Sequence, residues 1–163
     1  MTYDNFTIKA QESILKAQQI AAGYEQQTVD TVHLLKGILV TDEHVPHFLL
    51  KKMNVNIAAL DKQLEDHIKS YPKVQGVDKQ YLTDSANKSL SRAKKMLKEF
   101  GDEFISVEMI LLGIIQGKDK GAKILKDLGA KDKEMQEAIK ELRKGRKVTD
   151  QHAEDQYLSL IHI

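Results

Sequence analysis

Apolar residues recur every three to four positions along most of the chain, which is the spacing of one face of an α-helix. The first such segment covers about residues 7–22. Its apolar stripe consists of Ala10, Ile14, Ala17 and Ala21. Proline, which interrupts helices, occurs only at Pro46 and Pro72. The pattern therefore predicts an almost wholly helical fold with no strand longer than a few residues.

The hydrophobic pattern of the first half of the chain is repeated in the second half. A shift of 76 positions carries Thr7 onto Thr83 and Gly37 onto Gly113, and after one deleted residue the shift becomes 75. The larger shift also aligns TVDTVHLLKGIL with FISVEMILLGII. A match kept over about sixty residues with one gap indicates an internal duplication.

Each copy predicts four helices. In the first copy they cover about 7–22, a segment opening at Asp30, then 46–53 and 56–69. In the second copy they cover segments opening at Thr83 and Ser106, then 120–128 and 132–144. Thr, Asp and Ser are residue types that cap helix N-termini. We therefore predict an all-α fold of eight helices, built as two tandem four-helix repeats with pseudo-twofold symmetry. Beyond about Gly145 we expect a disordered or extended tail.

Four glycines have predicted structural roles. Gly23 and Gly101 follow the first helix of each copy, where a residue in the left-handed conformation often ends a helix. Gly37 and Gly113 lie inside apolar helices, where glycine lowers helix propensity. A close approach by a neighbouring helix would explain why glycine occurs there in both copies.

The charge of the chain is balanced, with 25 Lys and Arg residues against 24 Asp and Glu residues among 163. A chain without a basic excess is not expected to bind nucleic acid. There is no cysteine, and hence no disulfide framework and no Cys-based zinc site. The sequence has neither an apolar stretch of membrane-spanning length nor a signal-peptide pattern, so we expect a cytoplasmic protein.

The sequence contains no motif that indicates catalysis or cofactor binding. The phosphate-binding pattern GxxxxGK followed by Ser or Thr, the dinucleotide pattern GxGxxG and the zinc pattern HExxH are all absent. His44 and His47 form an HxxH beside Asp42 and Glu43, which falls short of the four good ligands of a structural zinc site. We expect no catalytic residue, no metal and no cofactor in this chain, and therefore no enzyme activity of its own.

Recognition of another molecule by the protein surface remains as a function. Leu90 belongs to the core stripe of its helix, and Met96 lies next to that stripe. Met109 lies in a helix first turn, where the first copy has His33. Methionine fills gaps in cores and also suits surfaces that accept varied apolar partners. Met96 and Met109 therefore either complete the core or line such a surface.

Three polar residues each have a structural explanation. Thr7 suits an N-cap, and Asp102 follows Gly101 in a turn. Glu108 lies in the first turn of a helix, where the macrodipole favours an anion. For each of them the structural role is the simpler explanation.

Three segments carry a family resemblance. They are the opening FTIKAQESILKAQQIA, the pair HLLKGIL and FISVEMILLGII, and the trailing GRKVTDQHAEDQY. Together, over about Tyr3 to Tyr157, they resemble the Clp N-terminal domain, the substrate-collecting module of bacterial Clp ring ATPases. The segment VTDQHAEDQY looks most like the lead-in to the first ATPase module of the ClpB-type disaggregases.

The resemblance implies a peptide-binding module of a hexameric, ATP-driven chaperone. Such a module binds exposed hydrophobic segments of unfolded or aggregated polypeptides, with no role for nucleic acid or membrane. The resemblance also implies an apolar groove and polar substrate-handling residues around it, made of Leu90, Met96 and Met109 and of Thr7, Asp102 and Glu108. ATP and Mg would belong to ATPase modules that this chain lacks, and we expect the isolated chain to be a monomer.

The resemblance also divides the chain into parts. Residues 1–145 would form the repeat domain, with repeats at 6–69 and 81–144 joined by a linker at 70–80. Residues 146–157 would be a linker that leads into an ATPase module. The last six residues, LSLIHI, would be an apolar tail of unknown origin.

Two departures from the family pattern leave alternatives open. Arg92 stands where some relatives have leucine on the groove helix. ClpC modules that bind phosphoarginine have a glutamate in both copies, whereas this chain has Glu108 in one copy and Val32 in the other. The alternative within the family is the N-domain of a protease-linked ClpC- or ClpA-like unfoldase, which binds adaptors or tagged clients. Outside the family, the alternatives are a small all-α enzyme and a purely structural helical domain.

Overall fold

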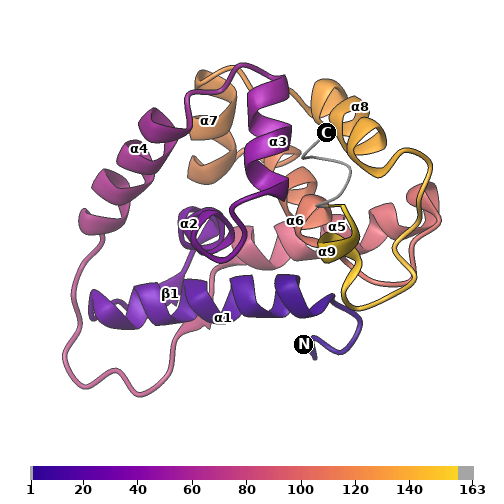
Figure 1. Cartoon of the computed structure of the whole chain (residues 1–163). Helices are drawn as coiled ribbons and strands as arrows, with labels where there is room; N and C mark the ends of the chain where they lie inside the picture. The colour runs from indigo at the N-terminus through magenta and orange to yellow at the C-terminus, as the bar shows by residue number, and fades with distance from the viewer. Residues whose placement is uncertain (1, 158–163) are drawn as a thin grey trace.

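The computed structural model describes residues 2–157, and in that range the chain forms nine helices and two short strands (Figure 1). The first repeat contains α1 (Ile8–Gly23), β1 (Thr28–Val29), α2 (Thr31–Thr41), α3 (Val45–Lys52) and α4 (Ile57–Lys69). The second contains β2 (Tyr81–Leu82), α5 (Asp84–Phe100), α6 (Val107–Ile115), α7 (Lys120–Asp127) and α8 (Asp132–Arg143). The short α9 (Ala153–Gln156) follows them. The predicted all-α class with two four-helix repeats is confirmed, and α9 is an addition to it.

The predicted N-cap residues begin the first two helices of each copy. Thr7 and Thr83 accept a hydrogen bond from the backbone N–H three residues later, at 3.1 Å in both copies. Asp30 caps α2 with its side chain, whereas Ser106 at the start of α6 makes no side-chain capping bond. The two copies therefore begin alike and differ at the start of their second helix.

Short segments of the two copies pair with each other in parallel. Val29 of β1 pairs in parallel with Leu82 of β2, and Phe6 forms a parallel bridge with Ile105. Leu82 is the repeat equivalent of Phe6, and Ile105 is the repeat equivalent of Val29. The segment before the first helix of each copy thus pairs with the segment before the second helix of the other copy. This reciprocal pairing is what pseudo-twofold symmetry requires.

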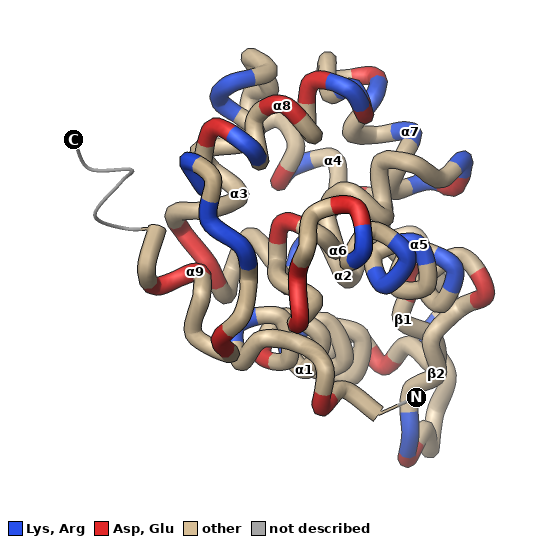
Figure 2. Tube along the Cα trace, turned by 90° about the vertical axis from the view of Figure 1, so that its right-hand side faces the viewer, with Lys and Arg blue, Asp and Glu red and all other residues tan. Residues whose placement is uncertain are grey.

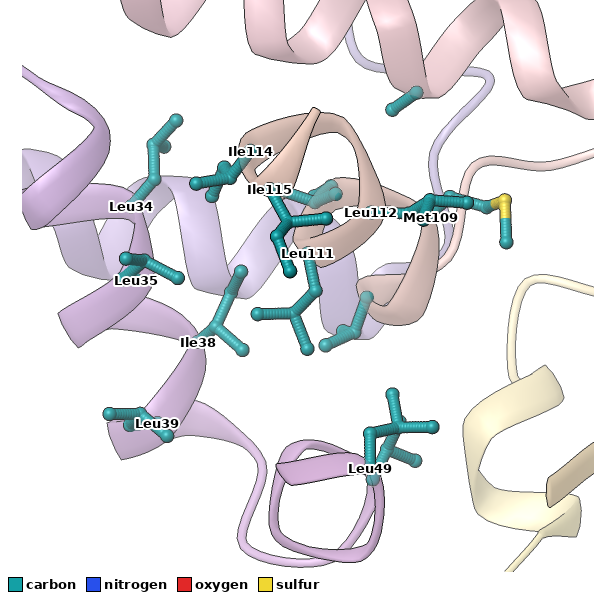
Figure 3. Packing of buried hydrophobic residues seen from close by; sticks show 14 of the residues in the cluster. Leu34, Leu35, Ile38, Leu39, Leu49, Met109, Leu111, Leu112, Ile114 and Ile115 are labelled. Atoms are coloured by element: carbon teal, nitrogen blue, oxygen red, sulfur yellow. The ribbon is translucent and has the colours of Figure 1, made fainter. Parts of the chain in front are cut away.

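The two apolar helices α2 and α6 lie at the centre of the molecule, with the other helices around them (Figure 1). Their side chains meet in a shared core (Figure 3). The buried residues that these helices contribute include Leu34, Leu35, Ile38, Leu111, Leu112, Ile114 and Ile115. Because one core serves both repeats, neither repeat buries its apolar face alone.

Gly37 and Gly113 allow the first and second helices of each copy to touch. A Cβ atom at Gly37 would lie 2.4 Å from the backbone oxygen of Ser13, and one at Gly113 would lie 2.2 Å from that of Ser89. Ser13 and Ser89 are themselves repeat equivalents. The predicted close approach is confirmed in both copies, with the same partner in each.

The two glycines after the first helices behave differently from each other. Gly101 has a φ of 68° and ends α5 in the left-handed conformation, as predicted. The same prediction for Gly23 is wrong, because Gly23 is the last residue of α1 and the left-handed residue is Glu25, with a φ of 58°. In the first copy the helix includes its glycine, and the left-handed residue follows two positions later.

The expectation of a disordered or extended tail beyond about Gly145 is wrong for residues 146–157, which we call the C-terminal strap. Val148, Ala153 and Tyr157 of the strap are buried, and Glu154 of α9 accepts a hydrogen bond from the first residue of α6. The strap folds back because these apolar side chains find a place to pack, although they lack helical spacing in the sequence. The predicted apolar tail Leu158 to Ile163 lies outside the described residues.

Candidate functional site

Three residues singled out in the sequence, Thr7, Asp102 and Glu108, meet in one buried polar cluster. Their side chains are joined by Arg143 at the end of α8 and by Glu154 of the strap. The side chains of Asp102 and Glu108 are fully buried, and that of Arg143 is 3% exposed. The cluster thus places three carboxyl groups and one guanidinium away from water.

Arg143 is the positive centre of this cluster. Its Nη1 and Nη2 atoms lie 2.9 Å from the two carboxylate oxygens of Asp102, and its Nε donates to Glu108 Oε2 at 3.0 Å. Burial lowers the pKa of Arg143, but the carboxylates of Glu108 and Asp102 together raise it above its ordinary value. Burial raises the pKa of Asp102, while Arg143 and the N–H of Val148 act against that rise.

Glu154 links the strap to the starts of α1 and α6. Its Oε2 accepts a hydrogen bond from Thr7 Oγ1 at 2.5 Å and one from the backbone N–H of Val107 at 3.0 Å. Burial, with the nearby carboxylate of Glu108, raises the pKa of Glu154 to about 8. Glu154 is therefore mainly protonated at neutral pH, which lessens the cost of burying it next to another acid.

The position of Glu154 has a counterpart in the first copy. There Asp30 Oδ1 accepts from the backbone N–H of Thr31 and from Thr83 Oγ1, both at 2.8 Å. Thr31 and Thr83 are the repeat equivalents of the two residues that donate to Glu154. Because Ser106 stands in the place of Asp30 and makes no capping bond, Glu154 supplies the missing N-cap acceptor of α6, a carboxyl oxygen, from outside the repeat.

The three apolar residues of the predicted groove do not lie together on the surface. Leu90 and Met109 are fully buried, whereas Met96 is partly buried and packs against the core. In Figure 3, Met109 lies on the opposite side of α6 from Leu34 and Leu35 of α2. The structure thus supports the core alternative for Met109, and its role in substrate binding stays a prediction.

A hollow of about 330 Å³ lies between the N-terminal segment, α5 and the segment before α6. Its lining residues are Thr2, Asp4, Asn5, Phe6, Leu90, Lys94 and Ile105. The buried apolar side chains Phe6, Leu90 and Ile105 form its floor, and the exposed residues Asp4 and Lys94 stand at its edge. Leu90 is the residue of the predicted groove that lines this hollow.

The polar cluster lies directly behind this hollow. Phe6 and Ile105 form the bridge that closes the floor, and the next residues along the chain, Thr7 and Ser106, belong to the cluster. Successive side chains of an extended segment point to opposite sides, so one side faces the hollow and the other faces the cluster. Thr7, Asp102 and Glu108 therefore support the wall of the hollow and do not line it.

The surface of α5 beside the hollow is basic (Figure 2). Its exposed residues include Lys88, Lys94, Lys95 and Lys98. Arg92, which departs from the family pattern, turns to α6, where its Nε donates to Gly113 O at 2.7 Å, and its Nη2 donates to Ser89 Oγ of its own helix at 3.1 Å. Arg92 is not among the residues that line the hollow.

At the start of α2, the first copy has His33 and Gln26 where the second copy has Met109 and Asp102. His33 Nδ1 accepts from the backbone N–H of Asp30 at 2.9 Å, and its Nε2 lies 2.7 Å from Gln26 Oε1. Burial lowers the pKa of His33 to about 4, so that the imidazole is neutral at pH 7. His33 occupies the place of Met109 and fixes the start of α2 through a capping box.

Among residues 2–157 there is no group of three or more His, Asp or Glu side chains that could hold a metal ion. No helix in that range is long and apolar enough to cross a bilayer. The described residues thus form an apolar hollow backed by a buried polar cluster.

Four residues of this site escaped the sequence interpretation: Phe6, Ile105, Arg143 and Glu154. Phe6 and Ile105 each come directly before a predicted N-cap, and the duplication places an apolar residue at both equivalent positions, Leu82 and Val29. That recurrence was a usable signal for the floor of the hollow. Arg143 and Glu154 had no such signal, because nothing in their local sequence indicates burial.

Comparison with protein families matches the chain to the Clp repeat (R) N-terminal domain over residues 5–128. Among curated proteins, the chain is 41% identical to the chaperone protein ClpB of Bacteroides thetaiotaomicron over 98% of its own length and 18% of that protein. It is 36% identical to ClpB of Porphyromonas gingivalis, with the same two coverages. The chain thus spans about a fifth of the length of these relatives.

Solved structures with the same fold include the N-terminal domain of Hsp104 from Candida albicans, with a TM-score of 0.80 and 19% identity. That match covers 92% of this chain and 99% of the Hsp104 domain. The N-terminal domain of the caseinolytic protease-associated chaperone ClpD from Arabidopsis thaliana matches with a TM-score of 0.65 and 21% identity, over 84% of this chain and 96% of that domain.

Proposed function

The chain belongs to the Clp repeat N-terminal domain family, and from that premise we propose that it is the substrate-binding module of a ClpB-like, ATP-dependent disaggregase. In this proposal it binds exposed hydrophobic segments of unfolded or aggregated polypeptides. The hollow beside Leu90 is the binding site, with Phe6, Leu90 and Ile105 as its apolar floor. Thr7, Asp102 and Glu108 hold that site in shape from behind, through the buried cluster.

The observation that carries the proposal is the apolar floor of the hollow together with the similarity to ClpB proteins along the whole described chain. The hollow is open at its edge, where charged side chains stand, so an extended segment can lie across it without threading. A site with three apolar floor residues offers few anchors, and an unfolded ligand loses entropy when it is ordered. We therefore expect a Kd on the order of tens of micromolar or weaker.

The remaining properties of the proposed protein follow from its place in the family. We propose that the isolated domain is a monomer and that the full-length parent is a cytoplasmic hexamer. ATP and Mg would act in ATPase modules outside this chain.

A protease-linked Clp unfoldase is the second candidate for the parent. The same fold occurs in ClpD of Arabidopsis thaliana, which is described as a chaperone associated with caseinolytic protease. In that case the domain would bind adaptor proteins or tagged clients. The 41% identity to ClpB, against 21% to ClpD, favours the disaggregase.

Titration of the domain with a permanently unfolded model protein, and with the native form of the same protein, tests the proposed function. We expect saturable binding of the unfolded form and none of the native form. Equal binding of both forms, or binding of neither, would contradict a client-collecting role.

Two lysine variants test whether the hollow is the site. Lys94→Glu places a second carboxylate at the edge of the hollow beside Asp4. Lys98→Glu changes the net charge by the same amount, one turn further along α5. Lys94→Glu should weaken binding several-fold and Lys98→Glu should not. Equal weakening would indicate a general charge effect.

A further inference from the structure

The C-terminal strap is attached to the domain at separate points (Figure 1). Gln151 O accepts from the backbone N–H of Ile8 at 2.9 Å, and its side chain donates to Asp4 O at 3.4 Å. At the other end, Val148 donates its backbone N–H to Asp102 Oδ1 at 2.9 Å and accepts from the backbone N–H of Glu103 at 2.7 Å.

The strap holds the N-terminal wall of the hollow from both ends. Asp4 and Phe6 line the hollow, and Thr7 is the next residue. Gln151 binds the wall at Asp4, and Glu154 binds it at Thr7. The position of this wall therefore depends on the strap as well as on the bridge to Ile105.

The free energy that keeps the strap packed on the domain is a balance of opposing contributions. Burial of Val148, Ala153 and Tyr157 favours it. Against this, Glu154 Oε1 is buried without a hydrogen-bond partner among the described residues, which is unfavourable. The helix of the strap has four residues and lacks a side-chain cap at His152, so it adds little stability of its own.

Release of the strap would leave the eight repeat helices intact. In the first copy, the carboxylate that caps α2 belongs to Asp30 within the repeat. In the second copy, the equivalent carboxylate comes from Glu154 of the strap. Because Glu154 contributes a capping bond and no bond inside a repeat helix, the strap can separate without breaking any turn of α1 or α6.

We propose that the C-terminal strap is releasable, and that its release frees the N-terminal wall of the hollow and lets the hollow widen around a client segment. The inference rests on the proposed function of the hollow. The strap then controls the width of the hollow. The hollow is narrower while Glu154 caps α6, and wider when the strap is released and the wall can move.

Hydrogen exchange tests release of the strap independently of any client. The marker amides are those whose hydrogen bonds join the strap to the rest of the domain. The backbone N–H groups of Ile8, Glu103 and Val107 donate to the strap, and that of Val148 in the strap donates to Asp102. We expect them to exchange together, and at least about tenfold faster than the amides in the middle of α2. Exchange of the markers at the rate of the α2 amides would show that they open only on global unfolding, and would overturn the proposal.

Two variants make the test specific. Glu154→Ala removes the cap and should speed exchange of the marker amides by about tenfold or more, with little change in α2. Asp155→Ala removes the neighbouring exposed acid and should change neither. If both variants, or neither, speed exchange of the markers, Glu154 is not what holds the strap.

Binding of a permanently unfolded protein separates this role of the strap from the proposed function. If the strap controls the width of the hollow, Glu154→Ala should bind that protein more tightly than the wild type does. Faster exchange with unchanged affinity would overturn this role of the strap. If neither the wild-type domain nor Glu154→Ala binds the unfolded protein, the proposed function fails, and the exchange rates alone decide whether the strap is releasable.

Discussion

Asp102 and Arg143 form a two-pronged ion pair, with both nitrogen–oxygen distances at 2.9 Å, where the first copy has a single hydrogen bond from Gln26 Nε2 to Ile68 O. Gln26 and Ile68 are the repeat equivalents of Asp102 and Arg143. Both copies thus join the loop after their first helix to the end of their fourth helix. The second copy makes this junction with buried charges, and the same junction receives the strap.

Arg143→Met should strongly destabilise the fold at neutral pH. The substitution leaves the carboxyl groups of Asp102 and Glu108 buried without their cation, which typically costs about 3–5 kcal/mol. Urea unfolding measures the loss in free energy of unfolding. The control is Lys52→Met, which breaks the exposed pair with Glu141 and should cost within about 0.5 kcal/mol. Similar losses in the two variants would contradict the importance of the buried cluster.

Alanine at the two internal glycines should destabilise the fold, because a Cβ atom has no room at either position. Gly37→Ala pushes α2 away from the carbonyl of Ser13 in α1, and Gly113→Ala pushes α6 away from the carbonyl of Ser89 in α5. Each variant should lose about 1–3 kcal/mol of unfolding free energy. Gly23→Ala is the control, since a Cβ atom there meets nothing within 4 Å and it should be neutral or slightly stabilising. A stable Gly113→Ala variant would show that these helices do not touch as described.

The contribution of His33 to the stability of the domain should rise with pH between about 4 and 6.5. Because the pKa of His33 falls from its ordinary 6.5 to about 4 on folding, the unfolded chain binds more protons in this window. The contribution should approach about 3 kcal/mol at the upper end of the window. His33→Gln keeps an acceptor for the capping box and removes the titration.

The comparison of wild type with His33→Gln isolates this histidine. The raised pKa of Glu154 makes stability fall as pH rises from about 4.5 to 8, but both proteins contain Glu154. Its contribution therefore cancels in the difference between them. Urea unfolding at several pH values should give a wild-type minus variant difference in unfolding free energy that rises with pH between about 4 and 6.5. Identical pH profiles would mean that His33 is not buried in its neutral form.

A glutamate at Met109 should lower the stability of the domain more than a glutamate at Met96. Met109→Glu buries a carboxyl group beside the core and should cost several kcal/mol, whereas Met96→Glu can reach water and should cost about 1 kcal/mol or less. Thermal melts compare the two. If Met109→Glu melts like the wild type and loses binding, Met109 is a groove residue after all, and the core alternative is wrong.

The duplication explains why so much of the fold could be predicted from the sequence. Gly37 and Gly113 recur at equivalent places, and a recurring unfavourable residue indicates a shared packing constraint. Gly23 carried the same kind of signal without a matching structure, because the left-handed position fell on Glu25 instead. Local sequence places a helix end only to within a few residues.

The site was harder to predict than the fold. Thr7, Asp102 and Glu108 each had a sufficient local explanation, and their meeting depends on Arg143 and Glu154, which are distant in sequence. Glu108 did offer one clue, since a charged residue inside the apolar run FISVEMILLGII needs a buried partner. The identity of that partner follows only from the three-dimensional arrangement.

Mapping of the binding site by NMR tests the central claim, that the hollow beside Leu90 receives apolar segments. An unlabelled, unfolded hydrophobic peptide is titrated into the isotopically labelled domain, and the amide shifts are followed. The account predicts that the largest changes fall on Asp4, Phe6, Leu90, Lys94 and Ile105. Changes centred instead on the hollow along α1, around Leu15 and Gln18, with those five amides unmoved, would contradict it.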